Sequence, residues 1–293
     1  MIAAAEQLRR EIREGRREDL AGARRRRSTH AVEIVGAYPE QVAVKVFRSC
    51  PRREAHKEWA FLQVAKRCGH RLAPSPIWCD LDHELPAVAM TRVPGSPLGE
   101  EPLSREQLAA LATLLQDLYA RIQAPSNRAN HDLPALDAIR GRWPARDPAW
   151  PPVVRAAHGG AGEWLAAEEL RTLPRPSTMV MGRGDCNLAN FLWAEDDSSM
   201  FHVDFEDSGG RALAVELADL VEHLESRHTP DPVWTDFVAG FHLSRPDRAW
   251  HAAYRRLYAV MWLLFLFPGG PASTRNPPGT LERQAERVLA LLG

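Results

Sequence analysis

The chain has 293 residues, a formal net charge of −1 at pH 7 and 45% hydrophobic residues. This length accommodates two modest lobes or one large domain, and either can bury a substantial core. A net charge near zero argues against a general nucleic-acid-binding protein, whose surface carries an excess of cations.

Cysteine usage and apolar runs indicate the cellular setting. The four cysteines are scattered and form no C-x-x-C pair, so neither a zinc site nor a disulfide framework is indicated. The arginine-rich N-terminus lacks the apolar core of a signal peptide, and the longest apolar run, residues 258–268, is shorter than the roughly 20 residues that span a bilayer. We expect a cytoplasmic protein, a monomer or a dimer, with neither a membrane nor a nucleic acid as partner.

The first third of the chain has the pattern of a small, β-rich lobe. Alternating apolar residues predict strands, and apolar spacing of three and four predicts helices. The expected elements are an amphipathic N-terminal helix, strands at 29–35 and 41–47 that form a hairpin, a helix at 53–68, and strands at 76–79 and 85–93. A stiff, turn-rich stretch at 94–97 then suits a connection between lobes. We therefore divide the chain into residues 1–93 and 94–293.

The second lobe is mainly helical by the same criteria. Helices are expected at 104–123, 162–172, 212–226, 233–241, 248–267 and 281–292, whereas residues 127–160 receive no element. The predicted fold class is α+β, with a small β-rich N-terminal lobe and a larger, mainly helical C-terminal lobe.

One short hairpin in the second lobe gathers oxygen-bearing side chains. Strand-like residues 191–194 and 200–205 flank a polar turn, and a turn centred near Asp197 pairs Asn190 with Asp204. Asp185 lies on a loop that can curl back over the same point. Two carboxylates and an amide oxygen suit Mg²⁺. The alternative is a polar hairpin in which these side chains only cap turns.

Lys45 is one of only three lysines in the chain, the others being Lys57 and Lys66. Strand alternation places Lys45 on the same face as Ala43 and Phe47, opposite three valines. A buried ammonium needs an anion, and Glu58 on the following helix is the candidate. A lysine at a strand edge, with its ammonium in solvent, is the alternative.

Taken in order, these motifs resemble a known set. Their order resembles that of the protein-kinase signatures: V-A-V-K, a helical glutamate, a lobe connection, G-D-x-x-x-x-N, a hairpin and V-D-F. The compact second lobe makes the chain more similar to the aminoglycoside phosphotransferase and choline kinase families. The resemblance covers residues 29–225 and implies a two-lobed protein-kinase-like fold, with residues 1–93 binding nucleotide and residues 94–293 binding the acceptor.

The resemblance also implies a role for each motif residue, with ATP and Mg²⁺ as cofactors. Lys45 would contact the α and β phosphates, and Glu58 would orient Lys45. Asp185 would be the catalytic base toward the acceptor hydroxyl, while Asn190 and Asp204 would hold Mg²⁺.

The nucleotide-binding residues are less well determined. The resemblance places Ala43 and residues 90–93, which include Met90, Arg92 and Val93, beside the adenine. No glycine-rich loop is recognisable over the phosphates. Backbone amides, the hydroxyl groups of Ser28 and Thr29, and the arginines at 24–27 are the three alternatives for that role.

Arg183 stands where the family has a histidine, two residues before Asp185. Its guanidinium would either lower the pKa of Asp185, weakening it as a base, or pair with the transferred phosphate. Because helix resumes by residue 212, the chain has no long activation segment, and we expect a small acceptor rather than a peptide.

Acidic residues cluster on the expected acceptor side, including Glu206, Asp207 and Glu222. They suit a cationic acceptor, or else they form a solvated helix face. Aromatic residues between 234 and 262 would wall a pocket or belong to the core. The predicted function is ATP-dependent phosphorylation of a small-molecule hydroxyl, with an aminoglycoside-like antibiotic, and hence resistance, first among candidates. The alternatives are a kinase of an amino alcohol or sugar metabolite and a non-catalytic nucleotide-binding relative.

Overall fold

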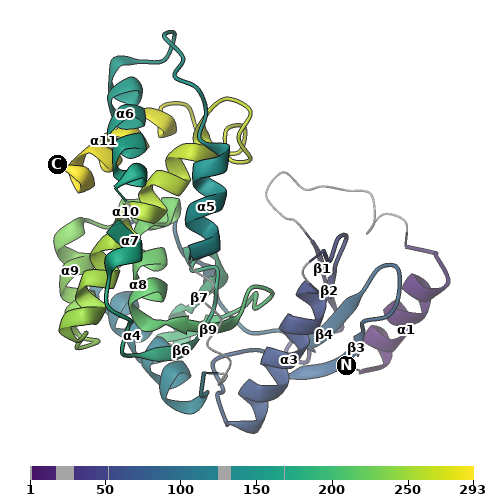
Figure 1. The fold of residues 1–293 in the computed structure, drawn as a ribbon. Helices are drawn as coiled ribbons and strands as arrows, with labels where there is room; N and C mark the ends of the chain where they lie inside the picture. Colours follow the sequence, from purple (N-terminus) through teal and green to yellow (C-terminus); the bar gives the residue numbers. More distant parts are fainter. Residues whose placement is uncertain (1, 18–29, 52, 125–132, 168) are drawn as a thin grey trace.

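The computed structural model describes residues 2–17, 30–51, 53–124, 133–167 and 169–293. These residues form two lobes side by side, with α1, α3 and β1 to β4 in the smaller one (Figure 1). The predicted fold class is confirmed. The division after residue 93 stays a prediction, and no helix among the described residues has the length and apolar character needed to cross a membrane.

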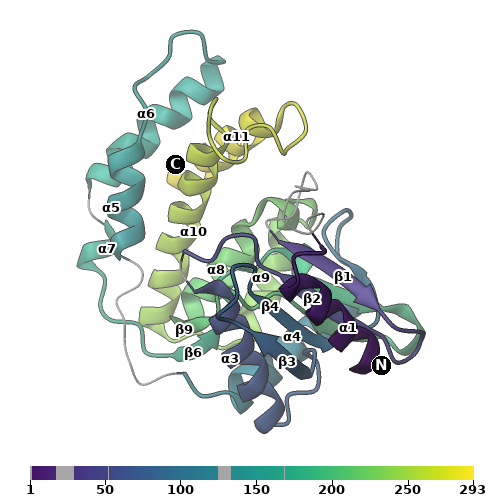
Figure 2. The same ribbon diagram turned by 90° about the vertical axis from the view of Figure 1, so that its right-hand side faces the viewer.

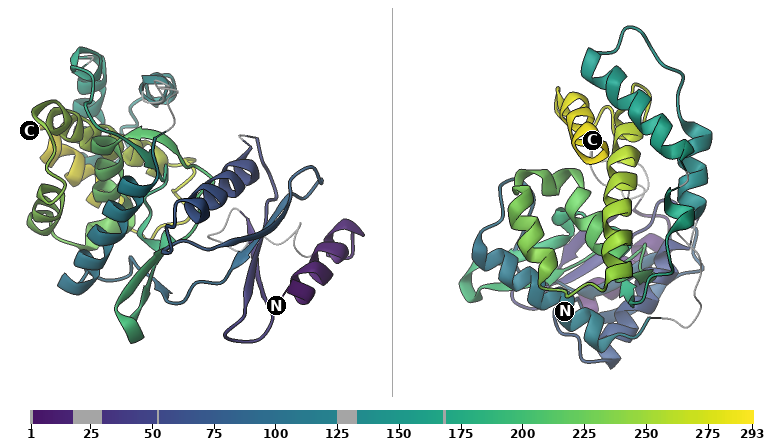
Figure 3. Two further views of the ribbon diagram at one scale, coloured as in Figure 1. Left: turned by 90° about the horizontal axis from the view of Figure 1, so that it is seen from below. Right: turned by 60° about the vertical axis from the view of Figure 1, so that its left-hand side comes forward.

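The N-terminal lobe is built on one antiparallel sheet with the strand order β1-β2-β4-β3. Its strands are β1 (Ala31–Val35), β2 (Val42–Val46), β3 (Pro76–Asp80) and β4 (Ala87–Thr91). Helix α1 (Ile2–Arg13) covers the outer face, and α3 (Glu54–Arg67) lies between the sheet and the C-terminal lobe (Figures 1 and 3). The predicted hairpin, the predicted N-terminal helix and the predicted helix at 53–68 are therefore confirmed.

The alternation along β2 determines which side chains face which helix. Val42, Val44 and Val46 pack with the apolar face of α1. Phe47 and Ala43 face the cluster that contains α3, on the opposite side of the sheet. Lys45 therefore projects from the α3 side, as strand alternation predicts.

The C-terminal lobe is mainly helical, and α10 runs through it (Figure 2). Its helices are α4 (Arg105–Arg121), α5 (Leu133–Arg142), α6 (Pro152–Ala166), α7 (Glu169–Thr172), α8 (Leu213–Glu222), α9 (Asp231–Ala239), α10 (Arg245–Leu266) and α11 (Thr280–Leu292). Ser104 closes a capping box with Gln107 at the start of α4. Asp247 lies in the first turn of α10 and accepts a hydrogen bond from the side chain of Ser177.

One helical prediction is wrong in extent, and one helix was not predicted. The helix predicted at 162–172 begins at Pro152 instead and is split into α6 and α7. Three glycines at 159, 160 and 162 weaken the helical pattern in the sequence. Burial of Val154, Ala157 and Ala161 in one core cluster stabilises α6 all the same. Residues 127–160, which received no element, also contain α5.

Two small sheets complete this lobe and bring the candidate residues together. They contain β5 (Ser96–Pro97), β7 (Phe191–Ala194) and β8 (Ser199–His202), and the unpredicted pair β6 (Met179–Gly182) and β9 (Gly209–Ala212). Phe191 faces His202 in the β7–β8 hairpin, and the carbonyl of Asn190 accepts from the amide of Val203 at 2.9 Å. Asn190 is therefore opposite Val203, one residue from the predicted Asp204, because the turn is shorter than predicted.

Candidate active site

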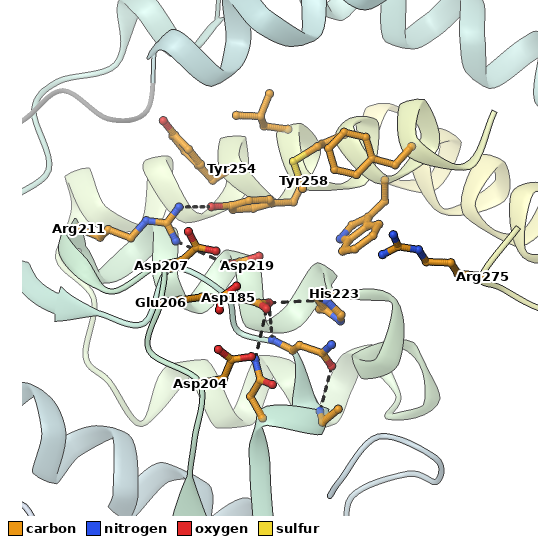
Figure 4. Close-up of a pocket in the computed structure, with 18 of the residues that line it drawn as sticks. Asp185, Asp204, Glu206, Asp207, Arg211, Asp219, His223, Tyr254, Tyr258 and Arg275 are labelled. Carbon is orange, nitrogen blue, oxygen red and sulfur yellow. Dashed lines mark hydrogen bonds and ion pairs between the residues drawn. The ribbon is translucent and has the colours of Figure 1, made fainter. Parts of the chain in front are cut away.

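A pocket of about 670 Å³ lies where the two lobes meet (Figure 4). Its walls come from β1 and β2, from the loops that follow β6 and β8, and from α8 and α10. The predicted site residues that line it are Lys45, Asp185, Asn190, Asp204, Glu206 and Asp207. Segments far apart in the sequence thus converge on one cavity.

Lys45 is the centre of charge on the N-terminal side of the pocket. Its Nζ lies 3.1 Å from Glu58 Oε2, 2.6 Å from Asp204 Oδ1 and 2.8 Å from Glu206 Oε2. Burial alone lowers the pKa of this lysine, but the three carboxylates outweigh burial and raise it above its ordinary value. The ammonium is therefore charged at every physiological pH, and the predicted contact with Glu58 is confirmed.

Glu58 connects this lysine to the loop that follows β8. The carboxylate is fully buried on α3 and its Oε2 also accepts a hydrogen bond from the amide of Phe205 at 2.9 Å. Burial raises the pKa of Glu58, and the neighbouring Lys45 opposes that rise. Phe205 stacks on Phe61 of α3 with ring centroids 4.0 Å apart. Glu58 thus fixes both Lys45 and the position of Asp204.

The carboxylates of Glu58, Asp204 and Glu206 lie within 4.8 Å of one another, a spacing that can hold a metal. The ammonium of Lys45 contacts all three, so this cluster is already balanced by a cation. Asn190 and Asp204 offer an amide oxygen and a carboxylate to the same pocket. Such hard oxygen donors, with space beside them for phosphate and water, fit Mg²⁺.

Asp204 has an unusual backbone conformation, with φ of 68°. Aspartate tolerates this left-handed region better than most residues, and strained non-glycine residues cluster at functional sites. The side chain keeps 36% of its surface exposed, toward the pocket. The loop therefore presents the carboxylate instead of burying it.

Asp185 lies on a tightly held loop between β6 and a 3-10 helix. Its Oδ1 accepts from the amide of Asn187 at 3.2 Å, and its Oδ2 accepts from Nδ2 of Asn190 at 3.3 Å. Gly184 before it has φ of 79°, and an added Cβ there would lie 2.0 Å from the carbonyl oxygen of Asp207. Burial and then the charge of Asp204 raise the pKa of Asp185, which makes it a stronger base than an ordinary aspartate.

The far end of the pocket combines acidic, basic and aromatic side chains (Figure 4). His223 Nε2 lies 4.0 Å from Asp185 Oδ1, and burial lowers the pKa of His223 to about 4. Arg211 donates to Glu216 at 2.9 Å and to the hydroxyl of Tyr258 at 3.3 Å. Burial raises the pKa of Asp219 to about 8, with Asp185 and Glu216 adding to that rise.

One face of α10 supplies the aromatic wall. Tyr254, Tyr258, Trp262 and Phe265 line the pocket at helical spacing. Of the aromatic residues between 234 and 262, Tyr254 and Trp262 therefore line the pocket, whereas Trp234 and Phe237 belong to the core. Five further residues line the pocket without having been predicted from the sequence: Tyr258, His30, Arg211, His223 and Arg275. Aromatic side chains repeated every fourth residue were the available signal.

Arg183 corrects one prediction. Its side chain is fully buried and does not line the pocket; it donates to His202 Nδ1 at 2.7 Å and to the carbonyl of Val203 at 2.8 Å. A pairing with the transferred phosphate is therefore wrong. The other alternative holds in direction only, because Arg183 does lower the pKa of Asp185, but burial and the charge of Asp204 outweigh this effect and leave the pKa raised.

Glu222 is a second correction, because its carboxylate lies outside the pocket. It is fully buried and accepts hydrogen bonds from Arg255 at 2.7 Å and Arg287 at 2.6 Å. Its charge therefore joins helices of the C-terminal lobe instead of facing an acceptor. Glu206 does line the pocket, but it contacts Lys45 and lies 3.0 Å from His30, at the N-terminal end of the pocket.

The residues predicted to border the adenine lie on or just after β2 and β4. Ala43 and Met90 are paired across the two strands, and the amide of Arg92 donates to the carbonyl of Gln41 at 3.0 Å. None of these, nor Val93, lines the pocket. Their contact with a nucleotide stays a prediction. Ser28 and the arginines at 24–27 lie outside the described residues.

Comparisons with known proteins agree with this fold. A family model described as the phosphotransferase enzyme family matches residues 24–259. Among curated proteins, none matches the chain in sequence.

Solved structures share the fold at low identity. The choline kinase LicA from Streptococcus pneumoniae has 14% identity and a TM-score of 0.61, over 97% of this chain and 98% of that one. Spectinomycin phosphotransferase APH(9)-Ia, solved with ADP and spectinomycin, has 11% identity and a TM-score of 0.65, over 90% of each chain. An aminoglycoside-3'-phosphotransferase of type VIII has 18% identity and a TM-score of 0.52, over 82% of this chain and 98% of that one. At such identities the likeness shows the fold alone.

Proposed function

The chain belongs to the phosphotransferase enzyme family and is a small-molecule kinase, and we propose that it transfers the γ-phosphate of ATP to a hydroxyl group of a small cationic acceptor. An aminoglycoside-like antibiotic is the first candidate acceptor. The observation that carries the proposal is the meeting of Lys45, Asp185, Asn190 and Asp204 in one pocket.

The N-terminal end of the pocket suits the nucleotide. Lys45 is a fixed positive charge that can exchange its contacts with Asp204 and Glu206 for phosphate oxygens, while Glu58 keeps it in place. Asn190 and Asp204 would hold Mg²⁺, which neutralises charge on the phosphates when bound. ADP in the spectinomycin phosphotransferase supports an adenine nucleotide, whereas GDP in an aminoglycoside 2'-phosphotransferase makes GTP the competitor to test.

Asp185 would accept the proton of the acceptor hydroxyl. As the new bond from the acceptor oxygen to the γ-phosphorus forms, the bond between that phosphorus and the β–γ bridging oxygen breaks, and ADP leaves. The hydrogen bonds from Asn187 and Asn190 orient the carboxylate toward the pocket. Its raised pKa makes this carboxylate a stronger base than an ordinary aspartate.

The acceptor end favours a cationic molecule. Asp185 and Asp207 are acidic, and the charge of Arg211 is already paired with Glu216. The ring faces of Tyr258 and Trp262 would attract an ammonium group through cation–π contact. This aromatic wall is the specific reason to keep an amino alcohol, such as choline, as a second candidate.

The proposal is tested by assaying the purified protein with ATP and Mg²⁺, and with GTP in parallel, against aminoglycosides, spectinomycin, choline, ethanolamine and neutral sugars. ADP release and mass spectrometry of each acceptor are the two readouts. We expect one class of cationic acceptor to gain a phosphate, and Asp185→Asn to lose that product. Binding of Mg²⁺ and ATP without any product across the panel would favour the non-catalytic alternative.

A further inference from the structure

A buried chain of polar side chains runs from the surface of α4 to the loop that carries Asp204. Asp117 Oδ2 lies 2.7 Å from His70 Nδ1, and His70 Nε2 lies 2.7 Å from His202 Nε2. His202 Nδ1 in turn lies 2.7 Å from the guanidinium of Arg183. The members come from α4, the segment after α3, β8 and the loop after β6, and His70, His202 and Arg183 are buried. Neither histidine nor Asp117 lines the pocket.

The chemistry of the two ends allows only one arrangement of protons. A guanidinium can only donate, so His202 Nδ1 accepts and its proton lies on Nε2. That proton can only be donated to His70 Nε2, which leaves the proton of His70 on Nδ1, facing the carboxylate of Asp117. Every contact then has one donor and one acceptor, and both imidazoles are neutral. Burial lowers the pKa of His70, in agreement with its neutral form.

Arg183 at the end of this chain supports the backbone beside Asp204. It donates to the carbonyl of Val203 at 2.8 Å and lies 3.4 Å from that of Asp204. Its guanidinium lies over the rings of Phe191 and Phe205, at 4.6 Å and 5.2 Å from their centroids. Among the described residues, no carboxylate contacts its side chain. Carbonyl groups, one imidazole and two ring faces therefore hold a fully buried cation.

We propose that the relay of Asp117, His70, His202 and Arg183 is a positioning device that holds Asp204 in its left-handed conformation, ready for the metal. Arg183 supports this loop through its carbonyls, and Glu58 holds it through the amide of Phe205. The relay locks the rotamer of Arg183 by fixing the tautomer of His202. The part that concerns Mg²⁺ rests on the proposed function.

The first test concerns the protons and needs no ligand. Nitrogen-15 NMR of the histidine side chains at pH 7 reports which ring nitrogen carries hydrogen, and His70→Asn and His202→Asn variants assign the signals. We expect Nδ1–H in His70 and Nε2–H in His202. The opposite tautomer in either ring, or a charged imidazole, would overturn the relay.

The second test measures the free Mg²⁺ concentration that gives half-saturation of ATP binding. In Arg183→Met we expect this concentration to rise about tenfold, the effect of losing a hydrogen bond from a charged group. Arg183→Lys, which keeps a cation, should recover part of the loss. Arg287→Met is the matched control, because Arg287 is a partly buried arginine that contacts Glu222 and does not line the pocket. We expect it to lower thermal stability without changing the Mg²⁺ requirement.

If Arg183→Met does not fold, Asp117→Ala tests the relay in its place. Asp117 is partly exposed at the far end of the relay, and its removal leaves every contact of the Asp204 loop in place. A higher Mg²⁺ requirement in this variant supports the relay, and an unchanged one overturns it. A wild-type protein that binds no ATP with Mg²⁺ would refute the proposed function, while the tautomer test would still decide the relay.

Discussion

Replacement of Lys45 by methionine tests the ionic cluster that joins the two lobes. Among the residues that the structure describes, Lys45 is the one cation that contacts Glu58, Asp204 and Glu206 together, and the substitution removes it. Methionine keeps most of the volume and the apolar stem, so the change is mainly one of charge. We expect loss of stability as well as loss of nucleotide binding.

The expected magnitude follows from burial. The side chains of Lys45 and Glu58 are 8% and 0% exposed, so solvent screens their attraction little. Removing one partner of such a buried pair costs about 3–5 kcal/mol, because the other charge is left uncompensated. Glu58 relieves part of this cost by taking up a proton. Its pKa is already raised by burial, and it rises further without the ammonium.

The sign of the pH dependence is therefore fixed. A carboxyl whose pKa is higher in the folded state than in the unfolded state destabilises the fold as pH rises through these values. The stability deficit of Lys45→Met should then shrink from pH 8 toward pH 5. Chemical denaturation monitored by tryptophan fluorescence measures it, and Glu58→Gln added to Lys45→Met should restore most of the loss. An unchanged unfolding midpoint in Lys45→Met, or no recovery in the double variant, would refute the reasoning.

Three further predictions concern catalysis, stability and backbone. Asp185→Asn should lower turnover at least about 100-fold, the usual contribution of a general base, with ATP affinity unchanged by calorimetry. Because the pKa of Asp185 is raised, wild-type turnover should fall on acidification at a higher pH than an ordinary aspartate would give. For the same reason, Asp185→Asn should raise the melting temperature at neutral pH. Glu222→Gln should lower the free energy of unfolding by roughly 3 kcal/mol and leave the acceptor KM unchanged. A raised KM would show that Glu222 contacts the acceptor after all. Gly184→Ala should abolish transfer, because its Cβ would overlap the carbonyl of Asp207; retained activity would contradict the loop geometry.

The sequence predicted those features that depend on local pattern. Alternation in β2 placed Lys45 on the α3 face, and charge balance selected Glu58 as its partner. The contact between Lys45 and Asp204, which joins the two lobes, required the resemblance as well. The hairpin near Asn190 was predicted one residue out of register, because the exact turn depends on Ser198 adopting a left-handed conformation with φ of 51°.

Features that depend on packing between distant segments could not be predicted. Arg183 precedes Asp185 by two residues, yet its side chain points into the core, toward His202 and His70. Glu222 has the sequence context of an acceptor-side acid, but arginines from α10 and α11 surround it. Side-chain direction in such cases follows from tertiary contacts that leave no periodic signal.

The central claim is that one Mg²⁺–nucleotide complex is held between Lys45 on one lobe and Asn190 and Asp204 on the other, beside Asp185. A crystal structure with Mg²⁺ and a non-hydrolysable ATP analogue tests it most directly. We predict Lys45 Nζ on phosphate oxygens, the metal on Asn190 and Asp204, and the γ-phosphate facing Asp185. A nucleotide bound elsewhere, or a metal held by Glu58 and Glu206 with Lys45 displaced, would contradict the claim.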